Sequence, residues 1–360
     1  MNKQSLQVLE LMSQPAFWAK EERVAWRNSA AVSLVEEGTS LDAILGSSLS
    51  LFSLWSGKDT LLLPLVLCGQ EFDGSARKLE DGIVFIAERR LPQLDAAAQA
   101  AAHAAACLRK PLHTMLSAAR ELFDLVEEQP DAVQPASQLN QALYQLLRLC
   151  NQLSDGGALA QQQLRAHREL TDLKAYFDRL ESQIRPLVEA AGLRLVYHGP
   201  KKAVNGWIDP ELIERAVHNL LTNAMHYTPK GGTIHLSAQQ QGKIFALILQ
   251  DEGEGIDATA MPHLFEHFNE PLSGDSRWGI GLGLTIVREI ARLHGGASML
   301  SCGGKNGGTT ALFSLSLESL PAELRSPNLL RYDYCSGLNH ALVELSEVLP
   351  SQEYNPANIL

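Results

Sequence analysis

The chain has 360 residues, of which 45% are hydrophobic and 20% charged, and its formal net charge is −11. This length exceeds one ordinary domain and the composition excludes wholesale disorder, so we expect two or three folded domains. The acidic balance argues against a general nucleic-acid-binding protein, which needs a basic surface.

The apolar segments and the cysteines predict a cytoplasmic protein. No apolar run reaches the roughly 18 residues of a membrane span, and the best candidate, Thr60 to Cys68, is short and contains Pro64. The N-terminus carries an acidic residue where a signal peptide has its apolar core. The cysteines are scattered without metal-ligand or redox spacing, which is typical of reduced thiols.

Residues 1–92 predict a small α+β module. Ala16 to Trp26 reads as two strands around a polar turn, and Asn28 to Val35 as a short helix. Leu61 to Cys68 and Gly82 to Ala87 are expected to be further strands.

Residues 93–163 predict two amphipathic helices. Apolar side chains recur at three- and four-residue spacings between Ala96 and Glu127. The segment EEQPDAVQP, with two prolines, is expected to end this first helix, and the second is expected to fade near Gly156 and Gly157. Two such helices form an antiparallel hairpin, which dimerisation would complete as a four-helix bundle. A plain helical linker is the alternative.

Residues 164–318 predict alternating helices and strands, with a clear helix start at Asp209-Pro210, an N-cap acceptor followed by proline. The expected helices are Thr171 to Ala191, Asp209 to Tyr227 and Leu284 to His294, and the expected strands are Leu193 to His198, Thr233 to Ala238, Lys243 to Gln250 and a pair within Ala297 to Leu317. Residues 319–360 form a tail with one expected helix, Leu338 to Val348, and no predicted role.

Two glycine-rich segments in this part indicate a ligand site. DEGEGI, Asp251 to Ile256, follows a strand, and its glycines allow a tight turn and close backbone approach. GIGLGL, Gly279 to Leu284, leads into a helix, whose N-terminal N–H groups bind anions. A dinucleotide fold expects such glycines after the first strand of a βαβ unit. Here they follow a polar loop, so we reject that interpretation.

A third segment places two asparagines on one helical face. Asn219 and Asn223 lie four residues apart. Their carbonyl oxygens could hold a hydrated Mg²⁺, which prefers oxygen ligands and keeps some of its waters. An ordinary pair of surface asparagines is the alternative for this segment alone.

Taken in order, the asparagine helix, DEGEGI, LFEHF and GIGLGL resemble the ATP-binding domain of histidine kinases, in the gyrase–Hsp90–kinase–MutL superfamily. The resemblance covers about residues 164 to 317. It implies an α/β sandwich that binds ATP and Mg²⁺ beneath a mobile lid. Together with the preceding segments, the expected architecture is α+β multidomain: a small α/β module, a helical hairpin and this sandwich.

The resemblance also implies roles for individual residues. Asp251 matches the adenine-binding acid, and Asn219 and Asn223 match the asparagines on the magnesium and phosphate side. His226 stands where the family often has lysine or arginine. The other matching positions are the loop glycines Gly253, Gly255, Gly279, Gly281 and Gly283, then Leu284, the lid residues Phe265 and Phe268, Thr309 near the adenine, and Tyr227 beside the base.

One position distinguishes branches of the superfamily. Hydrolytic members have a water-activating glutamate one turn before the second asparagine, and this chain has Asn219 there. The resemblance therefore favours transfer of the γ-phosphate to a protein side chain, which needs mainly positioning and charge neutralisation.

The first hairpin helix carries a segment that resembles the family's phosphoacceptor box, but Ala106 occupies the histidine position and Cys107 the acid beside it. Three interpretations remain. The chain is a degenerate kinase, or His113 or His103 has become the acceptor, or the chain phosphorylates a partner. His113 lies two turns along, roughly 10 Å, and His103 about 60° around the helix. The alternative for both histidines is that they are ordinary residues of a bundle helix with no role in phosphate transfer.

The first module, through its stretch VAWRNSAAVSLVEEGTSLDAIL, resembles a PAS sensor domain. No Cys or His is placed to attach flavin or haem, so a module that only mediates dimer contacts is the alternative to a ligand sensor. The sequence thus predicts a cytoplasmic, homodimeric relative of sensor histidine kinases in two-component signalling, and the family resemblance implies a response regulator or another protein as its partner. The rival hypothesis is a non-catalytic ATP-binding pseudokinase scaffold.

Overall fold

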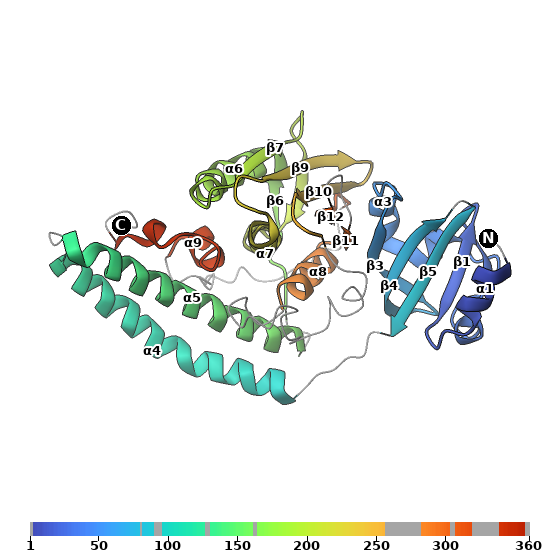
Figure 1. The fold of residues 1–360 in the computed structure, drawn as a ribbon, viewed down its shortest axis with the longest axis horizontal. Coiled ribbons are helices and arrows are strands. Elements are labelled where there is room, and N and C mark those ends of the chain that lie inside the picture. The colour runs from blue at the N-terminus through green and yellow to red at the C-terminus, as the bar shows by residue number, and fades with distance from the viewer. Residues whose placement is uncertain are drawn as a thin grey trace.

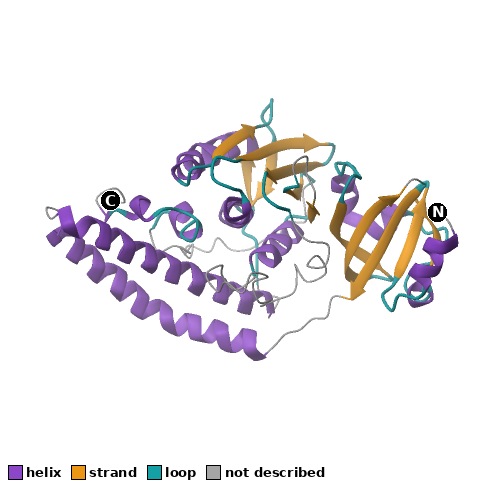
Figure 2. Cartoon of the chain, viewed as in Figure 1, coloured by secondary structure: helices purple, strands orange, loops and turns teal. Residues whose placement is uncertain are grey.

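The computed structural model describes residues 3–79, 81–89, 96–126, 130–160, 164–255, 282–302, 307–318 and 338–356. Within these ranges the chain is a mixed α/β protein with a large sheet and a pair of long helices (Figures 1 and 2). The expected combination of helices and an α/β domain is therefore confirmed. Among the described helices, none has the length and apolar character needed to span a bilayer.

The N-terminal module is an antiparallel sheet with short helices. Its elements are α1 (Lys3–Glu10), β1 (Ala16–Lys20), β2 (Arg23–Arg27), α2 (Leu41–Leu45), α3 (Leu49–Phe52), β3 (Thr60–Leu67), β4 (Gln70–Leu79) and β5 (Gly82–Arg89). The strand order is β2-β1-β5-β4-β3. Phe17 and Phe85 stack in the core with ring centroids 5.0 Å apart. Buried Asn28 ties α1 to the sheet, since it accepts from the N–H of Ala16 and donates to the carbonyl of Leu9.

Sequence periodicity missed β4, QEFDGSARKL. Only its alternate positions are buried, among them Phe72 and Ala76. Gly74 lies against Leu65 of β3 so closely that a Cβ would come within 2.3 Å of a methyl carbon. The glycine and charges look like turn signals, but they belong to a strand packed closely against its neighbour.

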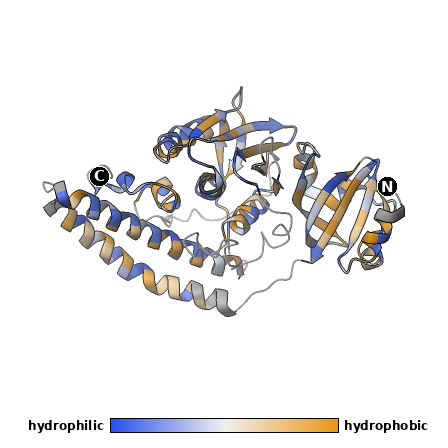
Figure 3. Ribbon diagram, in the orientation of Figure 1, coloured by the Kyte–Doolittle hydropathy of each residue, from blue (hydrophilic) through white to orange (hydrophobic). Residues whose placement is uncertain are grey.

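The helical hairpin consists of α4 (Ala96–Val126) and α5 (Pro130–Ala160). Apolar and polar residues alternate around both helices (Figure 3). The prediction that α5 starts beyond Pro135 and fades at Gly156 and Gly157 is wrong. Pro135 lies inside α5, one turn after the helix begins, where it removes the hydrogen bond to the carbonyl of Asp131 and the helix nevertheless continues. Both glycines are buried, and packing against the next domain offsets their poor helix propensity.

The third part places helices against one face of a sheet. Its helices are α6 (Leu173–Ala190), α7 (Pro210–Tyr227) and α8 (Gly283–Leu293), and its strands are β7 (Arg194–His198), β9 (Thr233–Gln241), β10 (Ile244–Asp251), β11 (Ser298–Cys302) and β12 (Thr309–Ser316). β7 pairs parallel with β9, and the other neighbours are antiparallel. Two further strands, β6 (Glu169–Asp172) and β8 (Asn205–Ile208), form a separate small sheet that the sequence did not predict.

The first and third parts share one ten-stranded sheet, in the order β2-β1-β5-β4-β3-β11-β12-β10-β9-β7. β3 pairs with β11 through Leu62 with Leu300 and through Thr60 with Cys302. The side chain of Gln241 also donates to the hydroxyl of Ser53 over 3.0 Å. The N-terminal module is therefore built onto the edge of the third part rather than standing apart from it.

The C-terminal segment packs between α5 and α7. It contains α9 (His340–Glu344) and a short 3-10 turn, Ser351–Tyr354. Asn339 caps α9 by accepting from the N–H groups of Ala341 and Leu342. The expected helix is present but shorter, and its apolar residues Leu342, Val343 and Leu345 join the core of the third part.

Candidate functional site

A buried carboxylate stands at the C-terminal end of β10. Asp251 is 7% exposed, and its Oδ1 accepts from the backbone N–H of Gly253 over 2.8 Å and of Thr309 over 3.0 Å. Burial raises the pKa of Asp251 above its ordinary value, and these two backbone hydrogen bonds partly oppose the rise. The two hydrogen bonds fix the orientation of the carboxylate at the junction of β10 and β12.

Glycines let two turns meet at this carboxylate. Gly255 has φ +80°, and a Cβ there would lie 2.0 Å from the carbonyl oxygen of Gly307. A Cβ on Gly308 would lie 2.0 Å from the carbonyl oxygen of Asp251. Gly307 and Gly308 are not among the residues predicted for the site, although the run GGKNGG before β12 is a signal for a close turn.

Helix α7 is held in place at its first turn. The side chain of Asp209 accepts from the N–H of Leu212 over 3.2 Å and from that of His167 over 2.7 Å. The N–H of Asp209 in turn donates to Nε2 of His294 over 3.0 Å, linking the start of α7 to the end of α8. The N-cap predicted from the sequence therefore fixes α7 relative to two neighbouring segments.

The predicted asparagine pair lies on α7, and Asn219 faces the start of α8. Asn219 is 5% exposed, and its amide donates to the carbonyl of Arg215 over 2.9 Å. Its Oδ1 would be 2.9 Å from a Cβ on Gly283. Asn223 follows one turn later and is half-buried. The two amide oxygens are the donor type that Mg²⁺ accepts alongside its waters, so these residues fit that ion.

Helix α8 begins at Gly283 without a side-chain N-cap, so its first N–H groups are left for other acceptors. Leu284 is partly buried against the core. The structure thus brings Asn219 and Gly283 together. Gly279, Gly281, Phe265 and Phe268 lie outside the described residues.

Two more predicted residues lie at the end of α7. His226 and Tyr227 meet edge to face, with ring centroids 4.5 Å apart. The Tyr227 side chain is more than half exposed. Its carbonyl oxygen would be 2.7 Å from a Cβ on Gly253, so the end of α7 lies directly against the glycine turn.

The candidate phosphoacceptor positions lie on α4, apart from the site around Asp251. Ala106 and His103 are exposed, and His113 is half-buried. Nε2 of His103 lies 3.9 Å from Sγ of Cys107 on the same helix face. Figure 1 shows α5 between α4 and the sheet that carries Asp251. The structure does not bring these histidines to the carboxylate.

The third part of the chain matches a known family. Residues 208–319 match the model described as histidine kinase-, DNA gyrase B-, and HSP90-like ATPase. The chain is 33% identical over 201 residues to the sensor protein IrlS of Burkholderia pseudomallei, covering 52% of this chain and 40% of that protein. It is 31% identical over 217 residues to the adaptive-response sensory kinase SasA of Microcystis aeruginosa, covering 58% and 56%.

A solved structure shares the fold. Full-length ShkA, crystallised in complex with AMPPNP, aligns with a TM-score of 0.50 and 21% identity, covering 62% of this chain and 47% of that one. The chain therefore carries an ATPase-type domain of this family and is related to sensor histidine kinases. It spans about half the length of the curated relatives it matches.

Proposed function

We propose that this chain binds Mg·ATP at the site around Asp251 and acts in the cytoplasm in two-component signalling. The observation that carries the proposal is the buried Asp251 carboxylate, oriented by Gly253 and Thr309 within the matched ATPase domain. A fixed carboxylate accepts hydrogen bonds from an exocyclic amine such as that of adenine. Relationship to sensor kinases supports the signalling role.

The remaining residues divide the nucleotide between them. Asn219 and Asn223 would hold Mg²⁺ and the phosphate side, and the N-terminus of α8 at Gly283 would receive a phosphate. Tyr227 would flank the base, and His226 would approach the phosphates in place of a lysine or arginine. The predicted lid and loop residues Phe265, Phe268, Gly279 and Gly281 complete this assignment.

The chain is proposed to work as a homodimer. Exposed apolar side chains on α4 recur every seven residues, at Leu108, Met115 and Leu122. On α5, Leu139 and Leu146 are exposed at the same spacing. These stripes lie outside the α4–α5 core, whose α4 residues include Leu112 and Ala119. A second hairpin would cover them as in a four-helix bundle.

The strand order of the N-terminal module and the similarity to sensor kinases support a sensor role and a partner protein. The five-stranded order β2-β1-β5-β4-β3 supports a PAS-like sensor module whose core is filled by its own apolar side chains. Kinship with sensor kinases supports a response regulator as the partner.

The second candidate function is a non-catalytic ATP-binding scaffold. Ala106 favours it, because alanine at the acceptor position has no group that takes a phosphate. The alternative within the kinase function is transfer to His113 or His103 on the same helix, or to a partner.

Labelled ATP distinguishes these functions. The purified chain is incubated with ATP labelled at the γ-phosphate, and the product is treated with acid or base, since phosphohistidine is acid-labile. Acid-labile label that disappears in His113→Ala or His103→Ala supports a relocated acceptor. Absence of label with intact ATP binding supports the scaffold, and steady phosphate release would indicate a hydrolytic ATPase.

A further inference from the structure

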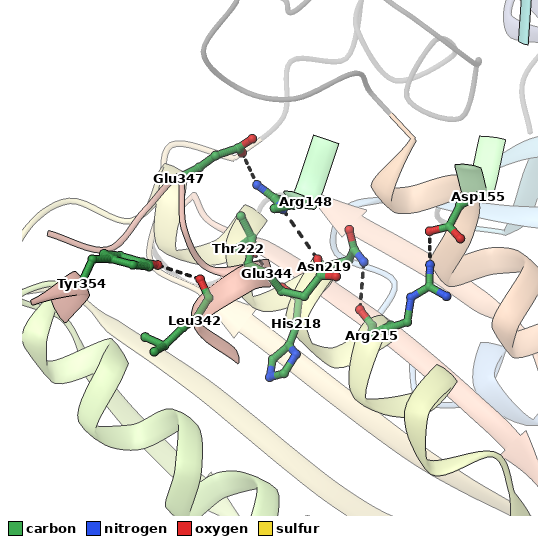
Figure 4. Close-up of polar contacts among 10 residues, drawn as sticks. All are labelled: Arg148, Asp155, Arg215, His218, Asn219, Thr222, Leu342, Glu344, Glu347 and Tyr354. Carbon is green, nitrogen blue, oxygen red and sulfur yellow. Dashed lines mark hydrogen bonds and ion pairs between the residues drawn. The ribbon is translucent and has the colours of Figure 1, made fainter. Parts of the chain in front are cut away.

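Glu344 of the segment 338–356 contacts both the hairpin and the ATP-binding half. Arg148 of α5 is buried and forms ion pairs with Glu344, over 3.6 Å, and with Glu347 (Figure 4). From the opposite side, the Thr222 hydroxyl of α7 lies 3.2 Å from the backbone carbonyl of Glu344 and shares its proton between that oxygen and the carbonyl of His218 on its own helix. Glu344 therefore links α5 to the helix that carries the asparagine pair.

Further contacts hold this segment on α5. Tyr354 is fully buried, meets Tyr144 edge to face at 5.3 Å, and donates from its hydroxyl to the carbonyl of Leu342 over 2.7 Å. Amide side chains of α5 donate to backbone carbonyls of the segment from Asn140, Gln141 and Gln145. Side-chain donors satisfy the backbone carbonyls of this irregular segment. These directional hydrogen bonds fix its position on α5, which apolar contacts alone would not do.

We propose that residues 338–356 are an intramolecular latch that holds the ATP-binding half against α5 and keeps its nucleotide site away from α4. Figure 1 shows α5 between α4 and this half. A buried ion pair between Arg215 of α7 and Asp155 of α5 strengthens the same contact. Transfer of a phosphate to α4 requires the ATP-binding half to move, and undocking the latch would leave Arg148 without its carboxylate partners.

The latch goes beyond the proposed function and acts without bound nucleotide, so it is tested in nucleotide-free protein. Spin labels are introduced as genetically encoded amino acids at Lys110 of α4 and Gln239 of β9, both exposed. Labelled full-length chains are diluted with unlabelled ones, and pulsed electron resonance measures the distance distribution. The variants are Tyr354→Ala, the matched control Tyr354→Phe, and a chain ending at residue 337.

The latch predicts a narrow distribution in the wild type and in Tyr354→Phe, which keeps the buried ring. It predicts about a twofold broadening, with new short distances, in Tyr354→Ala and in the shortened chain. Hydrogen exchange in β9 and β10 should stay protected, showing that the domain remains folded. Equally narrow distributions in all four proteins would overturn the latch, and so would broadening in Tyr354→Phe equal to that in Tyr354→Ala.

Discussion

Arg288 of α8 forms an ion pair with Asp73 of β4, joining the helix behind the candidate nucleotide site to the N-terminal module. The guanidinium is buried and the carboxylate partly exposed. Alongside this pair, Cys302 of β11 is in register with Thr60 of β3 on one side and with Thr309 of β12 on the other. The N-terminal module thus lies one strand away from a residue that hydrogen-bonds Asp251.

The ion pair predicts that Asp73→Ala destabilises the chain by about 2 kcal/mol, because the buried guanidinium of Arg288 loses this carboxylate. Urea unfolding followed by circular dichroism measures the loss. The double variant Asp73→Ala with Arg288→Met should recover most of it, since the buried positive charge is removed together with the carboxylate. An Asp73→Ala curve that overlays the wild type would contradict this role of the pair.

Asp251→Asn should weaken ATP binding by about 2 kcal/mol, or roughly thirtyfold, while the fold and the dimer stay intact. The amide keeps one oxygen for the N–H groups of Gly253 and Thr309, but it replaces the other acceptor with a donor facing the adenine amine. Fluorescent-nucleotide displacement measures the affinity, and circular dichroism checks the fold. Unchanged affinity would show that the pocket is assigned wrongly.

His218 predicts a loss of stability on acidification. It is fully buried on α7, and neither ring nitrogen has a hydrogen-bond partner among the described residues. Burial lowers its pKa, although the nearby carboxylates of Glu214 and Glu344 oppose this and the charges of His340 and Arg148 add to it. The unfolded chain therefore binds the extra proton first, and the free energy of unfolding falls as the pH drops below the unfolded value of about 6.5.

His218→Leu should flatten this dependence by up to about 1 kcal/mol per pH unit below pH 6.5. Urea unfolding at a series of pH values compares the two proteins. His294, also buried with a lowered pKa, contributes in the same direction and leaves a residual slope in both. Parallel profiles of the two proteins would show that the pKa of His218 does not differ between the folded and the unfolded chain.

The helical hairpin predicts a dimer that Met115→Glu or Leu122→Glu converts to monomer, because each places a charge in the shared apolar stripe. Sedimentation equilibrium gives the mass. Leu170→Glu is the matched control, since Leu170 is exposed on β6, away from the hairpin. A wild-type monomer, or dimers in all variants, would rule out this interface.

Much of the site could be predicted from local signals. The Asp209-Pro210 start and the four-residue spacing of Asn219 and Asn223 specify α7 and its polar face without distant contacts. Asp251 is predictable because a buried strand ends there in a glycine turn. In the structure Asn219 lies on the polar face of α7 against Gly283, and Asp251 ends β10 at the glycine turn, where its carboxylate accepts from Gly253.

The remaining features depend on contacts between distant segments. Pairing of Thr60 with Cys302 joins strands far apart in the sequence, and neither strand indicates its neighbour. The C-terminal segment has one short helix, and its contacts depend on Arg148 and on carbonyls that carry no sequence signal. Gly156 and Gly157 are helical only because tertiary packing outweighs local propensity.

Calorimetric titration of the purified full-length chain with ATP, with Mg²⁺ and then with excess chelator, tests the nucleotide site most directly. We predict saturable binding of about one ATP per chain that weakens markedly when the metal is removed, because two neutral amides alone cannot offset the triphosphate charge. If neither condition gives saturable heat, and ADP in a competition titration changes nothing, the assignment of the nucleotide site is contradicted.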